Sequence, residues 1–287
     1  MKLFKFISFY FFILTLYLLV GGCATRVPEV PELFRDASAD ELVQLLEARA
    51  SAIQTMKGLF KVQVKGPGLS FAKRVQGAIF FQRPQALRLQ GFTPFGGELF
   101  EFVLDDGRYR LRIPSSGQRY AGPVAELDRS QDISRPFRLS LLAMTCVVGI
   151  APVPQGAPVQ LAEEGARYRL DVFSSANRED GGEPKLSRRI WFERRTLQVT
   201  QEERLTPTGE VDAKLQCEDY RPLAAAGEQG TPQATAASHQ DIFVRPFKIT
   251  AEDAQGEGAL VMTFEEMIPN PSLTPKELGI EVVGAKP

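Results

Sequence analysis

The sequence has little of what catalysis and metal binding most often use. Histidine occurs once in 287 residues, as His239, and only three cysteines are present. His239 lies in a stretch of small and polar residues that is predicted to be disordered, and such a stretch holds a general base poorly. A Ser-His-Asp or Cys-His arrangement is therefore not expected. Cys146 and Cys217 lack the spacing of metal ligands, so no metal site is predicted.

An excess of charge of either sign is also missing. The chain has 34 Lys and Arg residues against 35 Asp and Glu, and no basic block stands out. Nucleic acid is therefore not an expected partner, and nothing in the sequence calls for a cofactor. Acidic residues are plentiful, which leaves a hydrolase with paired carboxylates as a hypothesis. However, Asp105-Asp106-Gly107 and Glu163-Glu164-Gly165 are typical of hairpin turns, and we predict that the chain is not an enzyme.

The N-terminus has the organisation of an export signal. Two lysines precede an apolar run from Phe6 to Val20, which is shorter than the roughly 20 residues that span a bilayer. Val20-Gly21-Gly22-Cys23 then resembles the lipobox of bacterial lipoproteins, in which the cysteine thiol receives a lipid. We expect residues 1–22 to be a signal peptide and Cys23 to be the lipid anchor. The alternative is an uncleaved anchor with an incidental cysteine.

The remaining chain is predicted to face the periplasm. Ala24 follows the cysteine, which by resemblance to enterobacterial sorting rules implies the outer membrane. Residues 23–37 are predicted to be a tether, and residues 38–287 a single domain with a low-complexity insertion at 223–240. In an oxidising periplasm Cys146 and Cys217 could pair, but the sequence leaves open whether they meet.

Two helices are predicted. Ser38 and Glu41 form a capping box, which predicts a helix starting at Ser38. Lys57-Gly58 has the order expected at its C-terminus. A second, shorter helix is predicted at 136–145, where large apolar residues gather.

Antiparallel strands account for most of the rest. Apolar and polar residues alternate in about eleven segments, and no alternation of strands with helices indicates a parallel sheet. We therefore predict an α+β fold: one large, curled, unclosed antiparallel sheet, a half-barrel whose concave apolar face is covered by helices. The predicted strands are 60–65, 69–82, 87–90, 98–104, 109–113, 167–174, 186–194, 197–205, 210–220, 243–250 and 258–268.

One set of alternating residues is predicted to line the concave face. It comprises Phe60, Val62, Val64, Leu87, Leu89, Phe100, Phe102, Leu104, Tyr109, Leu111 and Ile113. Two interpretations are open. The residues can simply pack on the helices as a core, or two helices can leave part of the sheet uncovered as an apolar cavity that is open to a lipid.

The order of these patterns resembles the LolA/LolB group of lipoprotein carriers and receptors. The resemblance rests on Phe60-x-Val62-x-Val64, Gly77-x-Ile79-x-Phe81-x-Arg83-Pro84, Leu87-x-Leu89 and the final Met262-x-Phe264 strand, and it covers about residues 38–273. It implies a half-barrel whose cavity accepts the acyl chains of a lipoprotein or lipid. Because Cys23 is present, the membrane-anchored receptor type fits better than the soluble carrier, and a periplasmic carrier protein is a conceivable partner.

The same resemblance assigns a role to one loop. In the receptor type, an apolar residue between Pro and Gly at a strand-connecting loop helps to place cargo in the membrane. The matching position is Phe95, with Phe92 nearby. A phenylalanine at a Gly/Pro-rich turn tip is free to enter a bilayer interface, unless both rings fold back onto the sheet. The alternative function is an RseB-like envelope scaffold or sensor that binds a protein partner.

Overall fold

A computed structural model describes residues 34–65, 73–84, 86–126, 134–148, 153–174, 183–223, 243–254, 256 and 258–280. Residues 35–287 form one compact unit, to which all the elements below belong. The predicted signal peptide, Cys23, most of the tether, His239 and all but Leu223 of the predicted insertion lie outside the described residues. Within the described part, no helix is long and apolar enough to cross a membrane.

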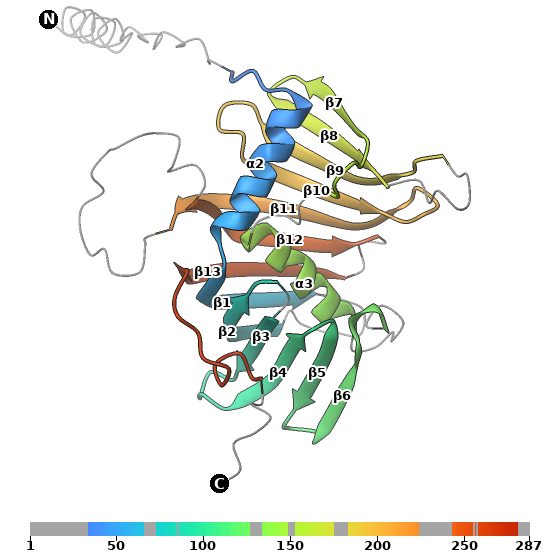
Figure 1. Ribbon diagram of the computed structural model, residues 1–287. Helices are drawn as coiled ribbons and strands as arrows, with labels where there is room; N and C mark the ends of the chain where they lie inside the picture. Colours follow the sequence, from blue (N-terminus) through green and yellow to red (C-terminus); the bar gives the residue numbers. More distant parts are fainter. Residues whose placement is uncertain are drawn as a thin grey trace, which may run out of the picture. The chain divides into compact units, whose positions relative to one another are not determined.

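The fold is dominated by a single antiparallel sheet of 13 strands in the order β6-β5-β4-β3-β2-β1-β13-β12-β11-β10-β9-β8-β7. The predicted curled, unclosed sheet with two covering helices is confirmed (Figure 1). The strands are β1 (Thr55–Lys65), β2 (Lys73–Gln82), β3 (Ala86–Phe92), β4 (Glu98–Asp105), β5 (Arg108–Ile113), β6 (Gln118–Pro123), β7 (Val159–Glu164), β8 (Arg167–Phe173), β9 (Leu186–Glu193), β10 (Val199–Leu205), β11 (Val211–Pro222), β12 (Val244–Asp253) and β13 (Ala259–Pro269).

The first and last strands of the chain pair in the middle of the sheet, and β6 and β7 are its two edges. The chain runs from the central β1 outward to β6, crosses through α3, and returns from β7 on the far edge to β13, which pairs with β1. Some neighbouring strands are joined by short turns, as in the β4–β5 hairpin, where Asp106 and Gly107 both have positive φ. Strands such as β1 and β3 alternate buried and more exposed residues, so that the curled sheet has one apolar, buried face.

Helix α2 (Ala39–Ala52) starts where the sequence predicts and ends earlier. Ser38 is its N-cap, and the reciprocal capping box with Glu41 is present. The predicted extension to Lys57-Gly58 is wrong, because the chain enters β1 at Thr55 and pairs with both β2 and β13. Gly58 serves a close approach of strands: a Cβ there would lie 2.9 Å from the carbonyl oxygen of Glu266.

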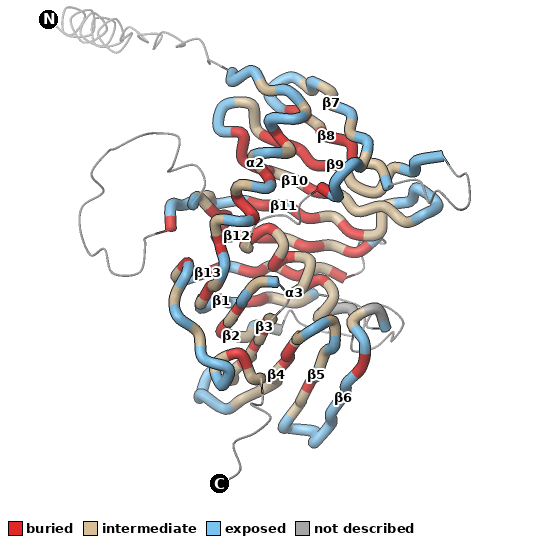
Figure 2. Tube along the Cα trace, in the orientation of Figure 1, coloured by how far each residue is buried: buried red, intermediate tan, exposed pale blue. Residues whose placement is uncertain are grey.

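Helix α3 (Ser134–Val147) crosses the concave face over the central strands, while α2 lies over the β7–β11 part (Figure 1). The buried residues accordingly form two apolar clusters, and buried positions recur along nearly every strand (Figure 2). One cluster joins α3 to β1–β6 and β11–β13, and the other joins α2 to β7–β10. Each of the two helices therefore packs on a separate half of the sheet.

Both edge strands, β6 and β7, are absent from the sequence prediction. Gln118–Pro123 holds one large apolar residue, Tyr120, and Val159–Glu164 ends in two acids. An edge strand pairs on one side only and buries less, so its sequence carries a weaker alternation than that of a central strand. The predicted eleven strands therefore become 13.

Cys146 and Cys217 meet and form a disulfide, which settles a pairing that the sequence left open. Their Cα atoms are 6.7 Å apart, within the range that a disulfide spans. The bond joins the last turn of α3 to the middle of β11. It fastens the C-terminal end of this helix to the sheet.

Candidate functional site

An apolar pocket of about 300 Å³ lies between α3 and the β2–β5 part of the sheet. One wall comes from the second half of α3, and the others come from β2, β3, β4, the β4–β5 turn and a short 3-10 helix, η1 (Val124–Glu126). The volume is at the lower end of the range for small-molecule sites. The lining residues are Phe81, Pro84, Leu87, Leu104, Gly107, Val124, Leu141, Met144, Thr145 and Val148.

Aromatic packing holds the other end of α3 against the same strands. The Phe137 ring stacks on Phe102 with centroids 5.6 Å apart and meets Phe100 edge-on at 5.2 Å. Phe102 is fully buried and also stacks on Tyr109. These contacts fill the space around Phe137, and the pocket lies beneath the C-terminal half of α3.

The structure brings together all the residues that were predicted to line the concave face. All eleven belong to or pack against the α3 cluster, and Leu87 and Leu104 line the pocket itself. Most of the others are packed core: Phe60, Leu89 and Leu111 are each at most 2 % exposed. A filled core therefore continues into a pocket at one end, and whether that pocket takes a lipid stays a prediction.

Most of the pocket lining was missed from the sequence. Phe81 stands in a quoted motif, and Leu141 and Met144 stand in the predicted second helix, so each carried an apolar signal. Which helix covers which strands is a tertiary property. Pro84 ends the motif that contains Phe81, and Val124 lies between β6 and α3, outside every predicted element.

Arg83 fastens the C-terminal ends of both helices to each other. Its Nε donates to the Ile53 carbonyl at 2.8 Å, and its Nη2 donates to the carbonyls of Ala50 and, at 2.9 Å, of Val148. The last carbonyls of a helix lack partners within it and carry partial negative charge, so a guanidinium is well placed there. Burial lowers the pKa of Arg83. The adjacent Pro84 belongs to the pocket wall.

Two further arginines, Arg49 and Arg245, hold the C-terminal end of α2. The guanidinium of Arg245 donates to the Arg49 carbonyl at 2.6 Å, and that of Arg49 donates to the Leu197 carbonyl at 2.7 Å. Burial, and then the nearby charge of Arg49, lower the pKa of Arg245 to about 10. Burial also raises the pKa of the neighbouring Tyr220. This cluster fixes α2 and lies apart from the pocket.

The β3–β4 turn presents Phe95 to solvent. The side chain is 98 % exposed, whereas Phe92 is half-buried at the end of β3. The turn is closed by hydrogen bonds from the Thr93 N–H to the Gly97 carbonyl at 2.7 Å and from the Gly96 N–H to the Thr93 carbonyl at 2.9 Å. Phe95 therefore does not fold back onto the sheet. Its side chain projects into solvent from a turn that two backbone hydrogen bonds close.

Several acidic residues are ion-pair partners of Arg or Lys. Burial raises the pKa of Glu101, but hydrogen bonds from Arg88 and Arg112 outweigh it and bring the pKa below its usual value. Hydrogen bonds from Lys57 and Thr274 lower the pKa of Glu277 to about 2. Among the described residues, Glu101 and Glu277 are thus held as carboxylates by cationic partners, the opposite of the raised pKa that a carboxyl needs to act as a general acid. No group of three potential metal ligands gathers in that part of the chain.

Comparison with known proteins gives no match by sequence: no family model and no curated protein matches. Solved structures do match. A LolA superfamily protein from Nitrosomonas europaea is 10 % identical, with 84 % of this chain and 97 % of that chain covered and a TM-score of 0.51. The chain has a LolA-like fold.

Two further structures agree with this LolA-like fold. A domain named for outer-membrane lipoprotein sorting from Vibrio parahaemolyticus is 8 % identical, covers 84 % of this chain and 97 % of its own, and has a TM-score of 0.54. A DUF1329 family protein from Desulfovibrio piger is 9 % identical, covers 85 % and 98 %, and has a TM-score of 0.55. At such low identities the agreement concerns the fold alone.

Proposed function

We propose that this chain is a non-enzymatic, lipid-anchored protein of the outer membrane that binds an acyl chain of a lipoprotein or lipid and passes it to the membrane. Cys23 holds the domain at the periplasmic surface. The pocket beneath α3 receives the acyl chain, and a periplasmic carrier protein delivers the cargo.

The observation that carries this proposal is the apolar pocket of about 300 Å³ beside the buried apolar cluster of α3. Each methylene that leaves water for such a pocket contributes about 0.8 kcal/mol. Thr145 is the one hydroxyl-bearing residue of the lining, and its Oγ1 is already bonded to the Leu142 carbonyl. The described wall therefore suits a hydrocarbon chain better than a polar ligand.

The exposed Phe95 supports the transfer step. Leu104 and Gly107, which line the pocket, lie at one end of the β4–β5 hairpin, and the turn that carries Phe95 lies at the other end. Between the two ends, Phe100 and Phe102 continue the apolar face along β4. Phe95 can therefore touch a bilayer without displacing a pocket residue.

We expect Phe95→Glu to slow transfer of a fluorescent acylated peptide from the protein to phospholipid vesicles by about tenfold, since a buried Phe side chain contributes about 1.5–3 kcal/mol. Binding of the peptide before vesicles are added should not change. Phe95→Leu is the matched control, because it keeps an apolar tip and should transfer at nearly the rate of the parent. Equal transfer rates for Phe95→Glu and the parent would remove the turn from the mechanism.

A further inference from the structure

Basic side chains lie at the end of the sheet that carries Phe95. Here β1 ends at Lys65, β2 begins, and the β3–β4 turn (93–97) and β5–β6 turn (114–117) connect their strands. Neither turn contains an acidic residue. Arg74 lies two positions beyond Gln76, the partner of Phe92, so the register places it about 7 Å further along, beside the β3–β4 turn. Arg119 is the second residue of β6.

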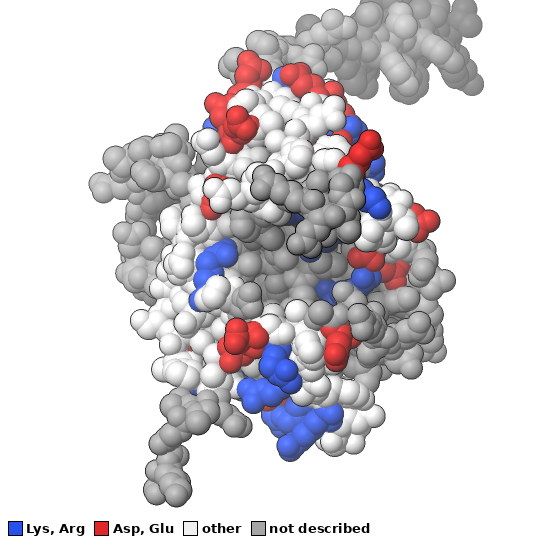
Figure 3. All heavy atoms as spheres, turned by 45° about the vertical axis from the view of Figure 1, so that its right-hand side comes forward, with Lys and Arg blue, Asp and Glu red and all other residues white. Residues whose placement is uncertain are grey.

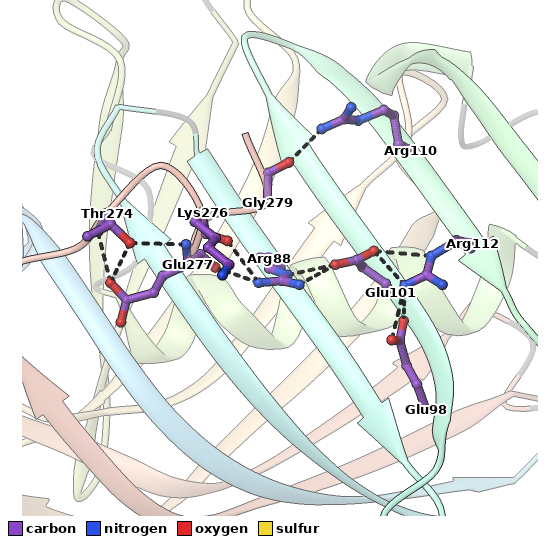
Figure 4. Close-up of polar contacts among 9 residues, drawn as sticks. All are labelled: Arg88, Glu98, Glu101, Arg110, Arg112, Thr274, Lys276, Glu277 and Gly279. Carbon is purple, nitrogen blue, oxygen red and sulfur yellow. Dashed lines mark hydrogen bonds and ion pairs between the residues drawn. The ribbon is translucent and has the colours of Figure 1, made fainter. Parts of the chain in front are cut away.

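Three arginines of β3 and β5, on the face of the sheet opposite the helices, are held by partners within the protein. Figure 4 shows Arg88 between Glu101 and the carbonyls of Lys276 and Glu277, and Arg112 between Glu98 and Glu101. Arg110 donates to the Gly279 carbonyl at 2.7 Å. The guanidinium groups of all three arginines are therefore engaged in the fold.

Lys65, Arg74 and Arg119 differ from those arginines. All three are exposed, and no salt bridge joins any of them to an acidic group in the described residues. Basic side chains gather where β4–β6 lie (Figure 3). At the opposite end of the same strands, Asp105 and Asp106 form the β4–β5 turn. Lys65, Arg74 and Arg119 thus lie at the end with the exposed phenylalanine, whereas Arg108 at the opposite end pairs in register with Asp105.

We propose that Lys65, Arg74 and Arg119 form a cationic collar that docks the Phe95 turn onto a membrane surface of anionic phospholipid. This proposal rests on the proposed function and specifies the class of lipid that the membrane surface presents. A ring that enters the interface, surrounded by cations at headgroup depth, gains from both apolar burial and attraction to anionic headgroups. Each cation close to such a surface strengthens binding by about fivefold, and salt screens the gain.

The test uses the full-length, lipid-anchored chain with Phe95→Trp as a reporter, reconstituted in vesicles. One set contains phosphatidylcholine alone, and in the other phosphatidylglycerol replaces part of it. Insertion is measured as the quenching of the introduced indole by brominated lipid, after subtraction of the signal of the parent, whose single Trp191 is 8 % exposed. The collar variant adds Arg74→Gln and Arg119→Gln, and the control adds Arg108→Gln and Arg167→Gln, two exposed arginines at the opposite end of the sheet.

We expect the inserted fraction to rise with phosphatidylglycerol, to fall at high salt, and to drop about 25-fold in equilibrium constant in the collar variant on anionic vesicles, with little change in the control. Equal insertion into both kinds of vesicle would overturn the collar while leaving membrane entry by Phe95 intact. Equal losses in collar and control variants would also overturn it. No insertion into either kind would instead overturn the proposed function itself.

Discussion

Glu202→Gln is expected to lower the free energy of unfolding by about 3–5 kcal/mol, the cost of breaking a buried ion pair. Glu202 is fully buried on the concave face, where it pairs in register with Ile190 and Leu215. Its Oε1 accepts hydrogen bonds from the Nε atoms of Arg188 and Arg204, each at 3.1 Å. The substitution keeps the shape of the side chain and removes a negative charge that both guanidinium groups contact.

Thermal denaturation of the two proteins measures this effect. For a domain of this size we expect the melting temperature to fall by about 6–20 °C, given about 2–4 °C per kcal/mol. Glu265→Gln is the matched control, because Glu265 pairs with Lys61 on the exposed face, where such pairs contribute about 0–1 kcal/mol. A loss in Glu202→Gln no larger than that in Glu265→Gln would show that the buried cluster is not a structural requirement.

Thr145→Trp is expected to abolish acyl-chain binding. Thr145 projects from α3 into the pocket wall, and an indole ring there would fill much of the 300 Å³. Displacing about five methylene groups at ~0.8 kcal/mol each weakens binding by about a thousandfold. Titration with a fluorescent fatty acid measures the dissociation constant.

Two further variants keep this prediction open to failure. Thr145→Val preserves the size of the side chain and should bind the fatty acid about as well as the parent. Val124→Trp fills the pocket from the η1 side and covers the case in which Thr145→Trp does not fold. A folded Thr145→Trp or Val124→Trp variant that binds with the affinity of the parent would place the acyl chain elsewhere.

The sheet core could be predicted because its signal is local. Leu87 and Leu89, or Tyr109 and Leu111, alternate with polar residues, and an antiparallel sheet with one buried face imposes this period of two. The start of α2 was equally local, since Ser38 and Glu41 satisfy each other within four residues. Such features depend little on the rest of the chain.

Features set by distant segments were not predictable. Met56-Lys57-Gly58 has the composition of a helix end, but pairing with β2 and β13 extends it as a strand. The contribution of Arg83 depends on two helix ends that lie far apart in sequence. The pocket likewise exists only because α3, 50 residues beyond Pro84, crosses the sheet at that place.

The central claim is that an acyl chain occupies the pocket beneath α3. Photo-crosslinking with a diazirine-bearing fatty acid, followed by peptide mapping, tests it most directly. We predict labels on α3 between Leu141 and Val148 and on Phe81, Leu87 or Leu104. Labels that fall instead on the α2 cluster of β7–β10, or an absence of labelling on a folded protein that binds a protein partner, would contradict it.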